Sequence, residues 1–156
     1  MMSSTNIKTA IDPLLSFGLN FDSHDLVSNR NGRITSRQVR LLRDKRDKQA
    51  PSQSIVHRII GGMFYMIYGV TPQRHQWNLV GADITATITH DLHGQVRLPE
   101  LDHPQLKGTP QSVYQISIDK KRCKVDRRAL RSFQHREIYT VYYAPRSKYA
   151  LSAEAT

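Results

Sequence analysis

Residues 137–143 form the run Glu137-Ile138-Tyr139-Thr140-Val141-Tyr142-Tyr143, which is rich in β-branched and aromatic residues. Such residues are typical of strands, and this run is the clearest strand of the chain. Ala144-Pro145-Arg146-Ser147 predicts a turn after it, and Tyr149–Ala153 predicts a strand that pairs back. The C-terminal part of the chain is therefore expected to be an antiparallel sheet.

More strands are predicted upstream of this hairpin. Residues 82–89 alternate with a period of two, and a turn is expected at His93-Gly94. Residues 113–118 would place Tyr114, Ile116 and Ile118 on one face, and residues 123–125 would return beside them. Five or six short strands in residues 77–156 favour a small antiparallel β-barrel, because closure removes bare strand edges.

Residues 22–50 carry the signals of a helical hairpin. Asp22 can cap a first helix, and Gly32 can end it in a left-handed conformation. Thr35 and Gln38 have the spacing of a capping box, which predicts a second helix over about residues 36–48. The predicted fold class is therefore α+β, with a basic helix–turn–helix hairpin, an apolar connecting helix and the β-barrel.

Residues 1–21 are expected to be a flexible N-terminus. Residues 51–76 are expected to connect the helical hairpin to the β-domain, and they contain the apolar segment 55–70. The segment is too short to span a bilayer, but its length suits a buried or an interfacial helix. It could dock on the β-domain or anchor the chain at a membrane surface. The residues expected to contact lipid or a partner are Ile59, Ile60, Met63, Phe64, Met66 and Ile67.

The formal net charge of +10 gathers in two patches. Residues 30–48 contain eight basic and two acidic residues, and residues 119–136 also contain eight and two. Basic patches can hold anionic lipid, acidic protein or phosphates. The predicted phosphate- or anionic-surface-binding residues are Arg37, Arg40, Arg43, Lys45, Arg46, Lys120, Lys121, Arg122, Arg127, Arg128 and Arg131.

Catalytic and metal motifs do not emerge from the sequence. No G-x-S-x-G elbow is present, and Cys123 fits a small core residue better than a reactive thiol. His90, His93 and His103 could be metal ligands, but a strand-to-turn junction does not make imidazoles converge. We therefore expect that the protein is not an enzyme and that it binds no metal, no cofactor and no small-molecule substrate.

Two stretches resemble a group of uncharacterised bacterial membrane-anchored proteins. Their YYxPRSxxLLSAE-type ending is similar to the run Tyr139-Thr140-Val141-Tyr142-Tyr143-Ala144-Pro145-Arg146-Ser147-Lys148-Tyr149-Ala150-Leu151-Ser152-Ala153-Glu154. Their opening, an L-x-x-N-R-x-G-R-L-S-x-x-Q pattern, is similar to the run Asp25-Leu26-Val27-Ser28-Asn29-Arg30-Asn31-Gly32-Arg33-Ile34-Thr35-Ser36-Arg37-Gln38. The resemblance implies a cytoplasmic helical hairpin, a membrane anchor and a small β-domain. It implies no activity, and the group usually has a pair of long apolar helices where this chain has only residues 59–70.

Charge, apolar segment and resemblance together predict a non-enzymatic binding or scaffold module. Its expected partner is an anionic membrane surface or a larger protein assembly, and the alternative is a nucleic acid bound by the two basic patches. A single cysteine and the lack of a signal-peptide pattern favour the cytoplasm, with peripheral attachment to the inner face of the membrane as one option.

Overall fold

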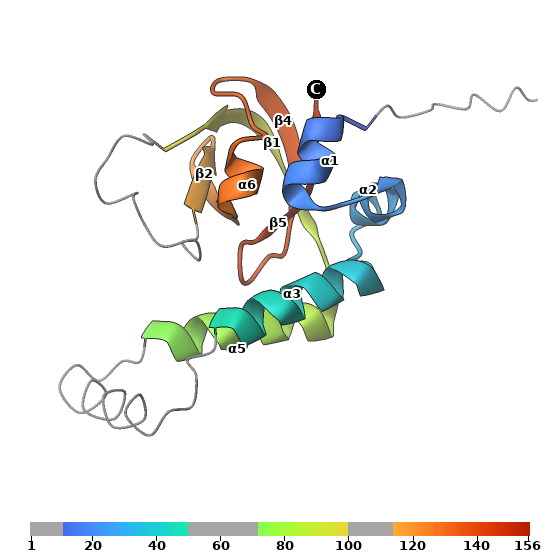
Figure 1. Ribbon diagram of the computed structural model, residues 1–156, viewed down its shortest axis with the longest axis vertical. Coiled ribbons are helices and arrows are strands. Elements are labelled where there is room, and N and C mark those ends of the chain that lie inside the picture. The colour runs from blue at the N-terminus through green and yellow to red at the C-terminus, as the bar shows by residue number, and fades with distance from the viewer. Residues whose placement is uncertain (1–10, 50–71, 100–113) are drawn as a thin grey trace, which may run out of the picture.

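The computed structural model describes residues 11–49, 72–99 and 114–156, which form one antiparallel sheet and five helices (Figure 1). The strand order in the sheet is β3-β2-β1-β4-β5. The helices are α1 (Pro13–Leu19), α2 (Ser23–Arg30), α3 (Ser36–Gln49), α5 (Pro72–Ala86) and α6 (Arg127–Leu130). The strands are β1 (His90–Arg97), β2 (Tyr114–Ile118), β3 (Lys121–Val125), β4 (Ile138–Tyr143) and β5 (Ala150–Ala155). The predicted α+β class is confirmed.

The two hairpins predicted in the C-terminal half are confirmed. Strand β4 pairs with β5 through Val141 opposite Ala153, and β2 pairs with β3 through Ile116 opposite Cys123. Tyr114, Ile116 and Ile118 are all buried, so β2 turns one face to the core as its alternation predicts.

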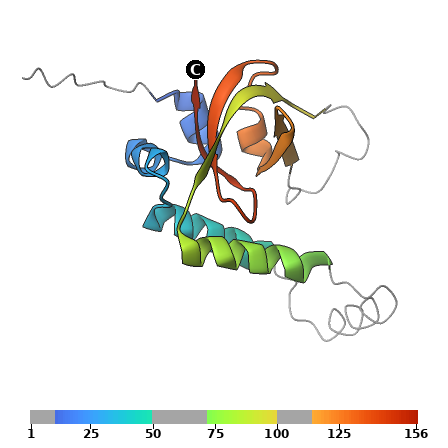
Figure 2. The same cartoon turned by 180° about the vertical axis from the view of Figure 1, so that it is seen from behind.

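The predicted closed barrel is wrong. The sheet curls until the edge strand β3 meets the chain just before β5, where the Lys124 amide donates to the Lys148 carbonyl at 2.7 Å. That contact remains a single isolated bridge between Lys124 and Tyr149, so the two edges do not form a ladder. Helices α1 and α2 pack against β5 instead (Figures 1 and 2). Covering an edge with helices protects it without closure.

The strand predicted at residues 82–89 is also wrong, because most of this run belongs to helix α5. Val80, Asp83 and Ile84 share the helical spacing of three and four residues, and they form the inward face of α5. The Asp83 carboxylate is fully buried and accepts hydrogen bonds from the amides of Arg146, at 3.1 Å, and Ser147, at 2.7 Å. These tertiary contacts outweigh the β-propensity of Ile84 and its neighbours.

The turn predicted at His93-Gly94 lies in the middle of strand β1. Gly94 has a φ of +159°, and a Cβ there would lie 2.7 Å from the Asp119 carboxylate. The glycine therefore marks a close approach between β1 and the turn that follows β2, and not a chain reversal.

The N-terminal prediction needs a correction at residues 11–21. Asp12 caps helix α1 by accepting from the Leu14 amide at 2.8 Å, and Leu15 is fully buried. This part of the expected flexible N-terminus is thus a docked helix, while residues 1–10 lie outside the described residues. The capping motifs are confirmed for α2, where Asp22 and Asp25 cap reciprocally, and for α3, where Thr35 and Gln38 do so.

Two hydrophobic clusters join the predicted hairpin to the sheet. Helices α3 and α5 run side by side below the sheet in Figure 1. Between them and the β4–β5 turn lies a cluster of Ile34, Leu42, Val80, Ala144, Tyr149 and Leu151. The larger cluster fills the space between the sheet and helices α1, α2 and α6. Residues 22–49 and the sheet therefore share their cores, and the apolar segment 55–70 lies outside the described residues.

A set of buried polar side chains, here named the polar junction, ties α2 and α3 to β5. The Asn29 and Gln38 amides exchange two hydrogen bonds of 2.8 Å, and the Ser152 hydroxyl donates to Asn29 at 2.6 Å. The Thr35 hydroxyl donates to Asp25, which is 1% exposed and pairs with Arg37. The polar junction consists of Asp25, Asn29, Thr35, Gln38 and Ser152.

Candidate functional site: a basic groove

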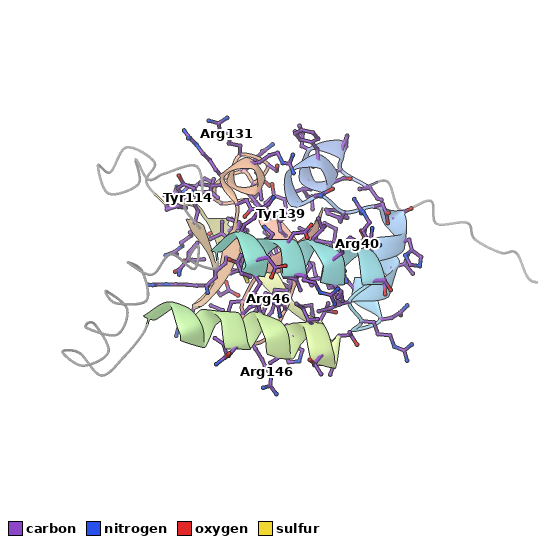
Figure 3. The ribbon with its side chains drawn as sticks, turned by 60° about the horizontal axis from the view of Figure 1, so that its bottom comes forward. Arg40, Arg46, Tyr114, Arg131, Tyr139 and Arg146 are labelled. Carbon is purple, nitrogen blue, oxygen red and sulfur yellow. The ribbon has the colours of Figure 1, made fainter. Side chains whose placement is uncertain are left out.

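An open groove of about 940 Å³ lies between α3 on one side and α1 with α6 on the other. Figure 3 looks at the molecule from the side of α3 and α5, and it shows α1 and α6 lying beyond α3. The apolar lining comes from five elements or their flanks, namely α1, α3, α6, β3 and β5. It consists of Leu14, Phe17, Leu19, Leu41, Leu42, Val125, Ala129, Tyr149, Ala150 and Leu151.

The charged lining of this groove is strongly unbalanced. Two acidic residues line it, Asp44 and Asp126. The six basic residues that line it are Lys45, Lys48, Lys124, Arg127, Arg128 and Arg131. They come from α3 on one wall and from β3, α6 and its flank on the other. The fold thus brings part of each predicted basic patch around one apolar floor, although the two patches are some eighty residues apart in sequence.

Of the predicted site residues, Lys45, Arg127, Arg128 and Arg131 line the groove. Arg40, Arg43, Lys120, Lys121 and Arg122 are exposed but do not line it. Arg37 is engaged within the fold, because it pairs with Asp22 and the buried Asp25, while Arg46 pairs at the surface with its sequence neighbour Asp47. The predicted apolar contacts at Ile59, Ile60, Met63, Phe64, Met66 and Ile67 lie outside the described residues.

Arg30, from the first basic patch, also has a structural role. It forms an ion pair with Glu154, and the Tyr142 hydroxyl donates to the same carboxylate at 2.7 Å. Burial alone would raise the pKa of Glu154, but the hydrogen bonds from Arg30 and Tyr142 hold it below its usual value. These contacts fasten the end of α2 to β5.

Lys45 reaches from α3 to the far wall of the groove. Its ammonium pairs with Asp126, at the start of α6, and lies 5.3 Å from the centre of the Tyr149 ring. Asp126 holds the N-terminal capping position of α6, but its side chain makes no capping hydrogen bond. The carboxylate is turned toward Lys45 instead, so one of the two acids in the groove is already neutralised.

Lys124 is a half-buried cation of the second wall. Its ammonium lies 5.6 Å from the centre of the Tyr149 ring, and no carboxylate of the described residues forms an ion pair with it. Burial lowers the pKa of the Lys124 ammonium, since the charged form loses hydration that nothing anionic replaces. An anion in the groove would offset that loss.

Helix α1 supplies an apolar lip that the sequence reasoning missed. Leu14 and Phe17 are 64% and 68% exposed, and their spacing of three residues places them on one face of α1. The Arg128 guanidinium lies 4.9 Å from the centre of the Phe17 ring. The only available signal was the short apolar run after Pro13, because the position of α1 beside α6 depends on the tertiary fold.

The wall formed by α1 and α6 is tightly packed at Gly18. A Cβ at this position would lie 1.8 Å from the Ser132 hydroxyl oxygen and 3.3 Å from the Ala129 Cα. Only a glycine lets the two helices approach this closely, so the groove wall is a fixed part of the fold.

The cysteine and the described histidines and carboxylates that could carry other chemistry make contacts within the fold. Cys123 is fully buried, and burial raises the pKa of its thiol to about 12, which opposes thiolate formation. The His93 ring bonds the Thr140 hydroxyl at 3.0 Å, while the His90 ring packs edge-on against Tyr143. His103 lies outside the described residues. Asp22, His24 and Asp25 lie close enough to share an ion, but both carboxylates already serve the cap of α2 and Arg37.

The tyrosines near the second basic patch face the core. Tyr114, Tyr139, Tyr142 and Tyr143 are each at most 8% exposed. They offer no surface on which bases could stack, which is the contact that single-stranded nucleic acid modules use.

Within residues 11–49, 72–99 and 114–156, no helix has both the length and the apolar character needed to cross a bilayer. Comparisons of the chain with family models, curated proteins and solved structures find no match.

Proposed function

We propose that this chain is a non-enzymatic binding module that attaches to an anionic partner through the basic groove. The partner would be an acidic component of a larger assembly or an anionic membrane surface. The observation that carries the proposal is that, within the described residues, six cations from two distant segments line one groove with an apolar floor, against two acids. Like charges gathered this way repel one another, and an anionic partner would relieve the repulsion.

Three of the described nucleophiles, Ser16, Ser152 and Cys123, are engaged within the fold, which supports a role without catalysis. The Ser16 hydroxyl donates to the Phe21 carbonyl, and the Ser152 hydroxyl donates to Asn29, so both are committed to the fold. Cys123 is buried among apolar residues with a raised pKa. None of these groups has the base partner that would activate it.

Nucleic acid is the weaker alternative for the same cations. Phosphates would be attracted to the six basic residues, but the buried tyrosines remove base stacking. An aliphatic floor such as Leu41, Leu42 and Leu151 also adds nothing to a phosphate contact. Apolar floor and basic rim together suit a partner that is both acidic and apolar.

Binding of anionic probes with charge-reversed variants tests the proposal. The probes are phosphatidylserine-containing vesicles, a labelled acidic peptide and a labelled single-stranded oligonucleotide, and affinities are measured by co-sedimentation and fluorescence anisotropy. Replacement of two exposed groove residues, Arg128→Glu with Arg131→Glu, should weaken the preferred probe about tenfold or more, which corresponds to roughly 1.4 kcal/mol. The affinity should also fall as salt is raised.

The matched control is Lys120→Glu with Lys121→Glu, which changes the net charge equally but lies outside the groove lining. This control should retain most of the affinity. Equal losses in both double variants would mean that only net charge matters and that the groove has no special role. Lack of binding to all three probes at low salt would refute the function itself.

A further inference from the structure

We propose that the occupant of the groove is an acidic amphipathic α-helix of a partner protein. This inference rests on the proposed function and narrows it to one class of partner. The apolar face of such a helix would lie on the floor of the groove, and carboxylates along both of its flanks would meet the basic rim. Three features of the groove support this choice.

The first feature is an apolar surface that continues from the floor up one wall. Leu42 and Leu151 lie at the bottom, Leu41 lies half-buried on α3, and Phe17 stands exposed on α1. A helix that places one apolar face in a groove would cover this surface and remove Phe17 from water. Leu42 and Leu151 are only 1% and 7% exposed. The gain of about 25 cal/mol per Å² of newly buried apolar surface would therefore come chiefly from Leu14, Leu41 and Phe17.

The second feature is that cations stand on both sides of the floor. Lys45 and Lys48 belong to α3, while Arg127, Arg128 and Arg131 belong to the wall of α6. An amphipathic helix can carry carboxylates on both borders of its apolar face, so it can meet both rows at once. The walls are themselves helices and present side chains, so an extended peptide would find few backbone groups to pair with there.

The third feature is that the rim already binds a carboxylate from this chain. Asp126 pairs with Lys45 across the groove and thus mimics the contact that a partner's Glu or Asp would make. A bound helix would compete with Asp126 for Lys45. The chain therefore contains an internal competitor whose removal should strengthen binding.

The same features disfavour a membrane or a nucleic acid at this site. A bilayer is broad and would touch Leu14 and Phe17 on the lip, but it would leave the space between the two walls of the groove unfilled. The Tyr149 ring is 3% exposed and is flanked by Lys45 and Lys124, so no base can stack on it.

The test uses a synthetic probe with the full-length chain. The probe is a blocked, labelled peptide of about 18 residues, long enough to hold a helix in water, with leucines on one face and glutamates on the other. Its first comparator has the same composition in an order that forms no apolar face, and its second carries lysines in place of glutamates. Affinities are measured by fluorescence anisotropy, beside phosphatidylserine vesicles and a single-stranded oligonucleotide.

The amphipathic acidic peptide should bind at least about tenfold more tightly than either comparator. Phe17→Gln should weaken binding several-fold, whereas Val27→Gln, which is exposed on α2 and outside the groove lining, should not. Asp126→Asn should strengthen binding several-fold. Phe17 and Val27 are both more than half exposed, so neither change threatens the fold, and thermal unfolding of each variant confirms this.

Each other outcome overturns the inference in a recognisable way. If the scrambled acidic peptide binds as well as the amphipathic one, charge alone acts, and the proposed function survives without the helix. If vesicles bind in a groove-dependent manner and the peptide does not, the partner class is wrong but the proposed function survives. If only the oligonucleotide binds in this manner, the nucleic-acid alternative replaces the proposed function. If no anionic probe binds, the proposed function has failed as well.

Discussion

Helix α3 contributes to two regions of opposite electrostatic character. At its N-terminal end Thr35 and Gln38 belong to the polar junction, where each buried polar side chain has a hydrogen-bond partner. At its C-terminal end Lys45 and Lys48 belong to the groove, where six cations share two acids. One region satisfies its polar groups internally, and the other leaves positive charge to be neutralised from outside.

This difference separates residues that hold the fold from residues available for binding. A buried polar group with every bond made contributes to a unique structure, and its loss leaves partners unsatisfied. A cation at the rim of a groove is solvated and contributes little to stability until an anion arrives. Substitutions in the two regions should therefore have effects of different size, and in one case of different sign.

The largest effect is expected for Asn29→Ala in the polar junction. Asn29 accepts from Gln38 and Ser152 and donates to Gln38 and to the Arg33 carbonyl at 2.8 Å. Its removal leaves several buried polar groups without partners, and each such group costs about 1–3 kcal/mol. We expect a loss of about 3 kcal/mol in the free energy of unfolding, measured by urea denaturation.

The control for this experiment is Arg43→Ala, an exposed position on the same helical hairpin, which should stay within about 0.5 kcal/mol of the parent. A loss below 1 kcal/mol for Asn29→Ala would contradict the structural role of the polar junction. Water would then have to make the hydrogen bonds of the lost Asn29 amide, and the polar junction would differ less from the groove than we infer.

The sequence predicted correctly those helix caps and hairpins that are determined by residues close together in the chain. The caps of α2 and α3 follow from Asp22, Thr35 and Gln38, whose side chains bond within three residues of their own position. The hairpins of the C-terminal half follow from the alternation of apolar residues in β2 and from the turn after β4. These features need no knowledge of the distant chain.

Features that depend on distant contacts were not predicted. Helix α5 is favoured by the buried Asp83, which binds amides more than sixty residues away, and by its packing on α3. The groove exists because α1, α3 and α6 meet beside β5, and no spacing within one patch encodes that meeting. The polar junction likewise links Asn29 and Gln38, in the N-terminal stretch that resembles the bacterial group, to Ser152 in the C-terminal stretch that resembles it. Its partners become visible only in the folded chain.

A second, smaller loss is expected for Gly18→Ala, which tests whether the groove wall is as firmly built as the polar junction. The new methyl group would overlap the Ser132 side chain, whose oxygen lies 1.8 Å from the position of the added Cβ. Overpacking of this kind costs about 1–3 kcal/mol, and we expect about 2 kcal/mol by urea denaturation.

Ser132→Gly provides the matched rescue, because it removes both side-chain atoms that the new methyl group would meet. The double variant Gly18→Ala with Ser132→Gly should recover most of the loss relative to Ser132→Gly alone, and this coupling identifies the cause. A Gly18→Ala chain as stable as the parent would show that α1 can shift on α6. The groove would then be adjustable in width, and the fixed wall described above would be disproved.

The smallest effect, with the opposite sign, is expected for Lys124→Met. The methionine keeps an unbranched apolar stem over the Tyr149 ring and removes a cation whose hydration is lost on folding. We expect a gain of about 0.5 kcal/mol in the free energy of unfolding at neutral pH. The same variant should bind an anionic probe more weakly. Lys120→Met, in the exposed turn after β2, should change neither property.

The pH dependence of this gain follows from the lowered pKa of Lys124. Between that pKa and the ordinary value of 10.5, the unfolded chain holds the proton more strongly than the folded chain does. The stability of the parent relative to the variant should therefore rise with pH through this window, and the gain should vanish above it. A gain that stays constant with pH would assign the effect to packing of the methionine. A loss of stability at neutral pH would mean that Lys124 is held by the fold as firmly as the polar junction, and the cation would no longer be available to a partner.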